Sequence, residues 1–304
     1  MTKPVPKVKK PHIPVLLEDV LEGCAGIPFS KGWFVDGTLG RAGHAVAILE
    51  KFSDAKILGL DQDQDAIDFV AAEFSSLIGA GRLDLSRVNF ENFSSAVEGR
   101  PIVGALLDLG VSSPQLDQAE RGFSFYHDGP LDMRMDKSRE MTAAILVNTW
   151  SDHELAEIFR TYGEVRRPER AAQALVEERK KQKFETTGQL SKFFERLDGW
   201  YKKGHHPATN YFQAIRIAVN DELGVLEKTL PKIVENLVDG GRLLVITFHS
   251  LEDRITKYVF RDLEEAGKIF LVNKKVIQSS WDEKKKNPRS RSAKLRIIQK
   301  GQRS

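Results

Sequence analysis

A glycine-spaced turn that follows a short apolar run is the feature that most constrains how this chain folds. The segment Phe34–His44 reads Phe-Val-Asp-Gly-Thr-Leu-Gly-Arg-Ala-Gly-His. Glycine tolerates positive φ and lets the backbone approach a ligand closely, which a side chain would hinder. The pattern therefore predicts a strand that ends at the binding site of a nucleotide-type cofactor.

The spacing of these glycines differs from that of dinucleotide-binding loops. Gly37, Gly40 and Gly43 follow G-x-x-G-x-x-G, whereas the dinucleotide fingerprint is G-x-G-x-x-G with the pyrophosphate at a helix N-terminus. The spacing thus speaks against a nicotinamide dehydrogenase. A tight strand-to-helix connection without a ligand would also use these glycines, so this alternative stays open.

A second apolar run ends in a carboxylate. Residues 56–61 read Lys-Ile-Leu-Gly-Leu-Asp. In open α/β sheets an acid about 20 residues beyond the glycine turn accepts hydrogen bonds from ribose hydroxyls. Asp61 is therefore the candidate ribose ligand. For Asp63 and Asp65 we favour the first turn of a helix, where carboxylates interact well with the helix dipole.

Apolar runs alternate with segments of helical spacing. We expect strands at residues 33–38, 56–61, 83–90, 102–109 and 242–248. Apolar residues at helical spacing follow the first two runs, over 45–49 and 66–74. This alternation predicts an α/β fold, Rossmann-like, with a mostly parallel sheet and crossover helices.

The alternation stops after Asp108 and helical patterns replace it. Capping boxes at Ser151–Glu154 and Thr186–Gln189, and apolar residues at i, i+3, i+4 and i+7 spacing over 190–197, indicate helices. The α/β pattern resumes with one expected helix over 212–226, followed by the strand at 242–248. We predict a discontinuous parent domain and an inserted helical domain that takes part in substrate recognition: residues 1–115 with 210–304, and residues 116–209.

Length and composition limit the number of domains and the cellular location that we expect. A chain of 304 residues suffices for one large or two unequal domains. Cys24 is the single cysteine, so no internal disulfide can form, and we expect a reducing, cytoplasmic location. The N-terminus lacks the apolar core of a secretory signal, and no run is long enough to span a membrane.

The net charge of +3 is modest, but basic residues gather at both ends of the chain. They are Lys3, Lys7, Lys9 and Lys10, and the stretch 284–303. Such clusters commonly contact phosphate backbones. A solvated, solubilising tail would have the same composition, so both interpretations stay open.

Polar residues follow the fourth expected strand. Residues 108–115 read Asp-Leu-Gly-Val-Ser-Ser-Pro-Gln, and their polar groups should meet Asp36 and Asp61 at the carboxyl edge of the sheet. A carboxylate, two hydroxyls and an amide beside a cofactor make a reaction site. A structural turn rich in Ser and Pro is the alternative.

Long motifs then occur in one order along the chain. Besides the glycine turn they are His12–Leu17, Asp108–Gln115, Arg121–Phe125, Asp128–Asp136, Tyr162–Glu164, His206–Thr209, Phe212–Ile217, Phe248–Arg254 and Asn287–Arg289. With these motifs the sequence resembles the RsmH (MraW) family of rRNA methyltransferases over nearly its whole length. The resemblance implies the fold of a class I methyltransferase.

The resemblance also implies an activity, a cofactor and a partner. The expected reaction transfers a methyl group from S-adenosyl-L-methionine to the exocyclic N4 amine of a cytidine in the decoding region of 16S rRNA, within the small ribosomal subunit. The sequence leaves open whether the protein forms a homodimer. The cofactor contacts that the motifs carry over are Ala42, Gly43, His44, Asp61, Phe93, Asp108 and Gln115. The family usually has Gly where Ala42 stands, so a contact there would use the backbone.

Asp108 is the candidate catalytic residue. A cytosine amine is a poor nucleophile until an acceptor polarises its hydrogens, and Asp108 or a nearby carbonyl could accept one. The sulfonium already activates the methyl group, so the task is mainly alignment. His206 and His249 are alternative bases, although each could be structural. We expect no metal, because the pair His205–His206 is insufficient and no Cys/His cluster has ligand spacing.

Recognition of an RNA base would need stacking and phosphate contacts. Phe123, Phe125 and Tyr126 could stack on the base or anchor the insertion. Candidate phosphate contacts are Arg166, Arg167, Arg170, Arg179, Lys180, Lys181, Lys284, Lys285, Lys286, Arg289, Arg291 and Arg296. Competing functions are methylation of a DNA or protein amine, and an RNA assembly factor without turnover.

Overall fold

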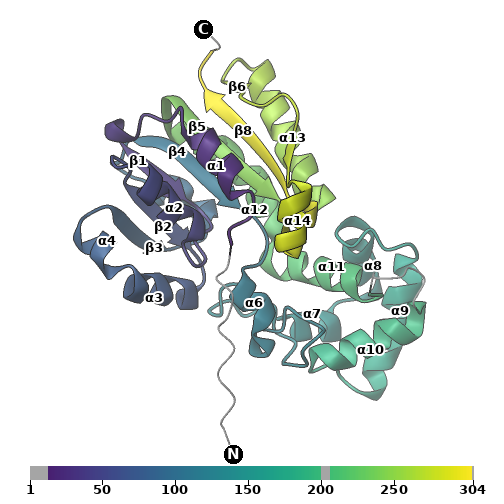
Figure 1. Ribbon diagram of the computed structural model, residues 1–304. Coiled ribbons are helices and arrows are strands. Elements are labelled where there is room, and N and C mark those ends of the chain that lie inside the picture. Colours follow the sequence, from purple (N-terminus) through teal and green to yellow (C-terminus); the bar gives the residue numbers. More distant parts are fainter. Residues whose placement is uncertain (1–12, 200–205, 303–304) are drawn as a thin grey trace, which may run out of the picture.

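The computed structural model describes residues 13–199 and 206–302. Figure 1 shows a body built on one sheet, with a smaller group of helices beside it. Several residues that the sequence analysis singled out lie outside the described residues: Lys3, Lys7, Lys9, Lys10, His205, and Arg303 at the end of the basic stretch. His12, the first residue of one motif, lies outside them as well.

The sheet has five parallel strands and an antiparallel extension. The parallel strands are β1 (Trp33–Asp36), β2 (Ile57–Asp61), β3 (Leu83–Arg87), β4 (Ile102–Asp108) and β5 (Leu237–Thr247). The strand order is β3-β2-β1-β4-β5-β8-β6. β8 (Lys294–Lys300) runs antiparallel between β5 and β6 (Ile269–Leu271), and the short β7 (Ile277–Gln278) also pairs with β8. The prediction of a Rossmann-like α/β fold is confirmed.

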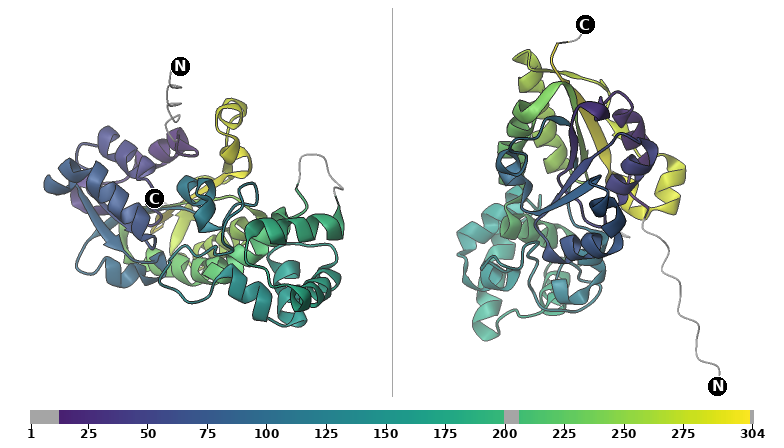
Figure 2. Two further views of the ribbon diagram at one scale, coloured as in Figure 1. Left: turned by 90° about the horizontal axis from the view of Figure 1, so that it is seen from below. Right: turned by 90° about the vertical axis from the view of Figure 1, so that its left-hand side faces the viewer.

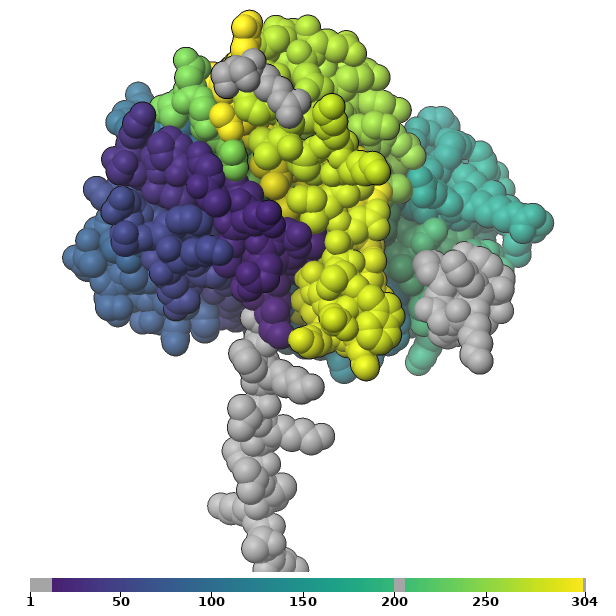
Figure 3. Space-filling view, turned by 45° about the horizontal axis from the view of Figure 1, so that its top comes forward, coloured from purple at the N-terminus to yellow at the C-terminus, as the bar shows by residue number. Residues whose placement is uncertain are grey.

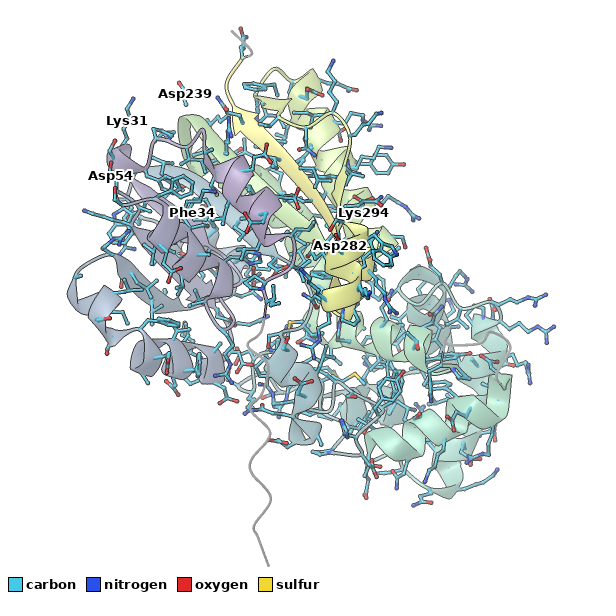
Figure 4. All side chains as sticks on the ribbon, in the orientation of Figure 1. Lys31, Phe34, Asp54, Asp239, Asp282 and Lys294 are labelled. Atoms are coloured by element: carbon cyan, nitrogen blue, oxygen red, sulfur yellow. The ribbon has the colours of Figure 1, made fainter. Side chains whose placement is uncertain are left out.

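Alternate residues of the strands face two separate hydrophobic cores. On one face Phe34, labelled in Figure 4, packs with residues of α1 (Leu17–Cys24) and α2 (Gly43–Lys51). On the other face Val35 packs with residues of α12 (Glu222–Asn236) and α13 (Ser250–Glu265). Both faces of the central strands are thus buried, which explains why their sequences read as continuous apolar runs.

Short helices also connect β2 to β3 and β3 to β4. They are α3 (Gln64–Glu73), α4 (Ser75–Gly79), the 3₁₀ turn η2 (Phe90–Asn92) and α5 (Phe93–Ala96). Asp63 caps α3, since its side chain accepts a hydrogen bond from the backbone N–H of Asp65 at 3.2 Å. The helix interpretation of Asp63 and Asp65 is therefore confirmed.

Five helices beside the sheet share one hydrophobic cluster. They are α7 (Ala143–Thr149), α8 (Asp152–Thr161), α9 (Pro168–Lys181), α10 (Thr187–Asp198) and α11 (Thr209–Asn220). Capping boxes start α8 at Ser151 and α10 at Thr186, as the sequence predicts. Figure 2 shows this group lying to one side of the sheet rather than across its faces.

The helix α11 belongs to this cluster. Tyr211 stacks on Phe194 of α10 with ring centroids 3.7 Å apart, and Phe212 and Ile215 are buried in the same cluster. The sequence analysis assigns residues from 210 onward to the parent domain. We propose instead that the helical domain extends through α11, because its apolar face packs on α7 to α10.

A single helix does not run through 212–226. Asp221 has a left-handed backbone, with φ of 50°, and separates α11 from α12. The chain therefore turns back toward the sheet at Asp221. Among the described helices, none combines the length and the apolar character that crossing a bilayer requires.

A buried ion pair joins the insertion to the sheet. The Nη1 atom of Arg121 lies 2.6 Å from Oδ2 of Asp63, and both side chains are almost fully buried. The Nη2 atom of Arg121 also donates to the backbone carbonyls of Arg134 and Met135, at 3.1 and 3.2 Å. One guanidinium thus holds the loop after β2 against the segment that enters the helical domain.

We expect Arg121→Ala to lower the free energy of unfolding by about 3–5 kcal/mol, because it leaves the buried Asp63 carboxylate without its cation. Urea denaturation followed by circular dichroism measures this. The matched control is Arg160→Ala, which removes a half-exposed arginine paired with Glu157 and Glu169 and should change little. Equal losses in the two variants would contradict the role of Arg121.

Candidate functional site

A cavity of about 1020 Å³ opens at the carboxyl ends of β1, β2, β4 and β5. Strand order reverses between β1 and β4, and open α/β sheets bind ligands at such a switch point. The cavity is lined by five groups of residues, which are Gly37–Arg41 with Gly43 and His44, Asp61 with Gln62, Val88–Phe90, Asp108–Gln118, and a wall from Arg216, Asn220, Glu222, Phe248, His249 and Glu252. Its volume is at the upper end of the range for small-molecule sites.

The outer rim joins the two ends of the described chain. Pro14, Val15 and Arg289 line the cavity. Behind them, the backbone N–H of Leu16 donates to Glu283 of α14 (Trp281–Lys286) at 2.7 Å. Figure 3 shows α14 as a yellow lobe next to the purple N-terminal segment. The helix α14 therefore holds the segment around Pro14–Leu16 against the glycine turn.

The glycine turn places backbone rather than side chains beside the cavity. Gly40 and Ala42 have positive φ, 51° and 59°. A Cβ on Gly43 would lie 2.6 Å from Cγ of Pro14, so glycine is needed for that contact. Ala42 is buried and is not among the lining residues, whereas its neighbours Arg41 and Gly43 are. The methyl group of Ala42 thus points away from the space where a ligand would lie.

Asp61 ends β2 at the cavity and supports the glycine turn. Its Oδ2 accepts from the backbone N–H of Gly40 at 2.8 Å, and its Oδ1 accepts from that of Asp63 at 2.9 Å. Burial raises the pKa of Asp61 to about 6. A carboxylate has about four acceptor positions. Two are used by the backbone, so the remaining ones suit ribose hydroxyls.

Asp108 ends β4 with an unsatisfied acceptor. Its backbone N–H donates to Oγ1 of Thr38 at 2.6 Å, which ties β4 to the glycine turn. Its Oδ1 is buried and has no hydrogen-bond partner within the described residues. Burial, and then the negative charge of Glu252, raise the pKa of Asp108 to about 7. An unpaired buried acceptor is costly, and the residue that carries it lines the cavity, as a residue that contacts a ligand would.

His44 lies beside Asp108 and is neutral. Its Nε2 lies 2.9 Å from the carbonyl oxygen of Val15, so Nε2 carries the proton and donates. Its Nδ1 then presents a lone pair 3.6 Å from Oδ2 of Asp108. Burial lowers the pKa of His44. Asp36, also buried, has its pKa raised to about 7 by burial. The site therefore concentrates carboxyl groups without a fixed positive charge among them.

Gln115 and Phe93 differ in where the structure places them. Gln115 lines the cavity in α6 (Ser113–Asp117), where its Oε1 accepts from the N–H of Ser112 and its Nε2 donates to Asp63, both at 2.9 Å. Phe93 is fully buried in the core against α12 and is not a lining residue. Phe90 lines the cavity instead. The expected contact between Phe93 and the cofactor stays a prediction.

A second wall of the cavity carries a charged cluster that the sequence analysis did not assemble. Arg216 forms a bidentate ion pair with Glu222, with both distances 2.8 Å. Glu252 accepts from the backbone N–H of Phe248 at 2.7 Å and of His249 at 3.2 Å. Burial alone would raise the pKa of Glu252. The nearby His249 and Arg216, together with these N–H groups, instead hold that pKa below its usual value. The available signal was the His-x-x-Glu spacing of a helix cap at 249–252.

This cluster resembles a cation site but already contains a cation. Ligand atoms of Glu222, His249 and Glu252 lie within 4.8 Å of one another. The guanidinium of Arg216 occupies both oxygens of Glu222 and would repel a metal ion. We therefore assign the cluster as an ion-pair network. The expectation of no metal stays a prediction.

Some of the side chains predicted to contact RNA are exposed, whereas others are buried or paired within the protein. Phe123 is buried in the helical core, which fits an anchor, whereas Tyr126 is 76% exposed. Arg296 pairs with Asp253 at 2.8 Å, and Arg289 pairs with Asp117 at 2.9 Å. Lys285 and Lys286 of α14 are exposed. Arg179 donates to the carbonyl of Val147, and Lys180 and Lys181 pair with glutamates one turn away.

The sequence matches known proteins along nearly its whole length. A family model described as the MraW methylase family matches residues 9–301. A ribosomal RNA small subunit methyltransferase H from Bdellovibrio bacteriovorus is 49% identical over 97% of this chain and 91% of its own. Proteins of the same name from Symbiobacterium thermophilum and Crocosphaera subtropica are each 45% identical over 95% of this chain, and over 96% and 89% of their own. The resemblance predicted from the motifs is confirmed, and the chain belongs to the MraW methylase family.

Proposed function

We propose that this chain methylates the exocyclic N4 amine of a cytidine in the decoding region of 16S rRNA, within the small ribosomal subunit. Membership of a methylase family gives the reaction class. The names of the relatives support small-subunit rRNA as the substrate. The observation that supports an amine as the methyl acceptor is Asp108, a cavity-lining residue whose buried Oδ1 has no hydrogen-bond partner among the described residues.

S-adenosyl-L-methionine is the methyl donor, and the residues of the cavity fit its parts. Asp61 has acceptor positions left for ribose hydroxyls. Val88 and Phe90 offer an apolar surface for the adenine ring of the cofactor. The turn at Gly40 offers backbone groups to the rest of the cofactor. When bound, the cofactor supplies a methyl group that its sulfonium has already activated.

The residues of the chain then have to position and polarise the acceptor. The lone pair of a cytosine amine is delocalised into the ring, so the nitrogen is a weak nucleophile. A carboxylate at Asp108 that accepts a hydrogen bond from the amine favours electron density on the nitrogen. As the N–C bond forms, the S–C bond of the sulfonium would break to leave S-adenosylhomocysteine, and the carboxylate would take up the proton that the amine loses. The hydrogen bond from its backbone N–H to Thr38 fixes Asp108 in place, which supports alignment, the main contribution to such a transfer.

Two surface features support an RNA substrate. A base inside a folded RNA must leave its stack to enter a cavity of this kind. Tyr126 is exposed and lies in an aromatic group with Phe125 and His206, whose rings stack at 4.4 Å. The exposed Lys285 and Lys286 of α14 lie on the rim element that holds the N-terminal segment and suit phosphate contacts.

The first test is methyl transfer to small ribosomal subunits from cells that lack the enzyme. With methyl-labelled S-adenosylmethionine we expect label in the rRNA, and in N4-methylcytidine after nucleoside analysis. Label in another nucleoside would contradict the cytidine assignment. Cofactor binding without any labelled rRNA would point to another acceptor or to an assembly factor without turnover.

Asp61→Ala should weaken binding of S-adenosylmethionine about tenfold or more, because charge-assisted hydrogen bonds to the ribose are lost. Isothermal titration calorimetry measures the affinity. Asp54→Ala is the control, since Asp54 is an exposed acid beyond the end of α2, as Figure 4 shows. Because Asp61 also supports the glycine turn, the melting temperature is measured alongside. Unchanged affinity in a folded Asp61→Ala variant would remove the ribose assignment.

Asp108 should give methyl transfer a pH dependence near neutrality. Burial raises its pKa to about 7, so the carboxylate forms as the pH rises through 7, and the single-turnover rate should rise with it and then level off. Asp108→Asn should be slower and should lose this rise. His44, Asp36 and Glu252 surround Asp108, and the variant separates their titration from its own. An identical pH profile in the variant would exclude Asp108 as the titrating group.

A further inference from the structure

Two residues that each carry an unsatisfied, buried polar atom line the cavity. Four buried side-chain atoms lack a hydrogen-bond partner in the part of the chain that the structure describes: Asp108 Oδ1, Thr229 Oγ1, His249 Nε2 and Ser279 Oγ. Of these four residues, Asp108 and His249 line the cavity, whereas Thr229 and Ser279 do not. The proposed function uses Asp108 and leaves His249 without a role.

The hydrogen bonds of His249 determine which ring nitrogen carries its proton. Its Nδ1 accepts from the backbone N–H of Glu252 at 3.4 Å, so Nδ1 is unprotonated. The proton is therefore on Nε2, which is a donor. Nε2 lies 3.1 Å from Oε1 of Glu252, but their alignment does not make a hydrogen bond. The nearby negative charge nevertheless favours the proton on Nε2.

The donor and the acceptor lie at the ends of neighbouring strands. β4 and β5 are paired in parallel with Asp108 opposite Ile246, and the N–H of Leu109 donates to the carbonyl of Ile246 at 3.0 Å. His249 follows Ile246 by three residues. The two side chains thus line one cavity from adjacent positions along its edge.

An acceptor next to a donor is complementary to one kind of nucleobase edge. Cytosine presents an exocyclic amine next to the ring acceptor N3, and adenine presents an amine next to N1. On their Watson–Crick edges, uracil and guanine present a carbonyl oxygen next to a ring N–H, which is the opposite pattern. The cavity therefore suits an aminated base and disfavours the other two, because buried polar groups would be left unpaired.

We propose that His249 is a specificity-determining residue that donates from Nε2 to the ring nitrogen beside the target amine, while Oδ1 of Asp108 accepts from the amine. This rests on the proposed function, in which a base amine receives the methyl group. Glu252 holds the ring of His249 through the cap of α13, and the ion pair of Arg216 with Glu222 forms the wall next to it.

The test combines a protein variant with a substrate variant. His249→Asn keeps an N-cap residue at the start of α13, since Asn is among the preferred caps, but removes Nε2. The matching substrate is a small subunit reconstituted with 16S rRNA that carries 3-deazacytidine at the target, in which a C–H replaces N3. Single-turnover kcat/KM is measured for the four combinations, with wild-type enzyme and natural RNA as the reference.

Each single change should lower kcat/KM about tenfold, because each removes the same hydrogen bond. The two changes together should then cost little more than either alone. Losses that multiply to about a hundredfold would show that His249 acts elsewhere and would overturn the proposal. Changes in electron density of the 3-deaza base act on both enzymes alike and cancel in this comparison.

Three further measurements separate the remaining outcomes. Affinity for S-adenosylmethionine and the melting temperature should be unchanged in His249→Asn, and a large fall in either would assign His249 to cofactor binding or to the fold instead. Nucleoside analysis of the wild-type product distinguishes the two aminated bases, because N6-methyladenosine would make adenine the base that is read. No methylated base at all with the wild-type enzyme would overturn the proposed function, and this inference with it.

Discussion

The convergence of carboxyl groups at one edge of the sheet is the constraint on which the rest of the site depends. Parallel strands bring Asp36, Asp61 and Asp108 to the same buried edge, where burial raises the pKa of each. Backbone N–H groups, and not cations, satisfy most of the oxygens of Asp36 and Asp61. Asp108 differs, because its buried Oδ1 has no hydrogen-bond partner among the described residues and the residue lines the cavity. The fold thus leaves an acceptor available for a ligand while it satisfies the others.

The helical domain completes the site because it is fixed to the same edge. Arg121 joins its entry to Asp63 in the loop after β2. At its exit, Asn220 accepts from the N–H of Met135 and donates to the carbonyl of Met133, each at 2.9 Å. Both contacts are buried and polar, which specifies one arrangement more narrowly than apolar packing would. The second wall of the cavity, from Arg216 to Glu222, is therefore held at a defined position opposite the cofactor turn.

Local patterns in the sequence predicted much of this structure. The apolar runs gave all five parallel strands, and the caps at Ser151 and Thr186 gave the starts of two helices, because these signals depend on neighbouring residues. The missed features depend on distant ones. Asp221 breaks a pattern that is apolar on both sides of it, and β8 lies between β5 and β6 despite its basic composition. The charged wall joins α11, α12 and α13, and spacing alone does not show that these elements meet.

Along this edge, the ends of β1 and β2 carry different chemical groups from the ends of β4 and β5. The turn after β1 and the end of β2 carry backbone groups and a carboxylate that suit a nucleoside cofactor. Asp108 ends β4 and His249 follows β5, and each carries a buried atom without a hydrogen bond among the described residues. The glycine turn needs small residues so that backbone can approach a ligand. In our proposal, selection of the base is assigned to the side of β4 and β5, where Asp108 and His249 line the cavity. Asp108, which Thr38 ties to the glycine turn, connects the two halves and is the point at which binding of the cofactor and reading of the base meet.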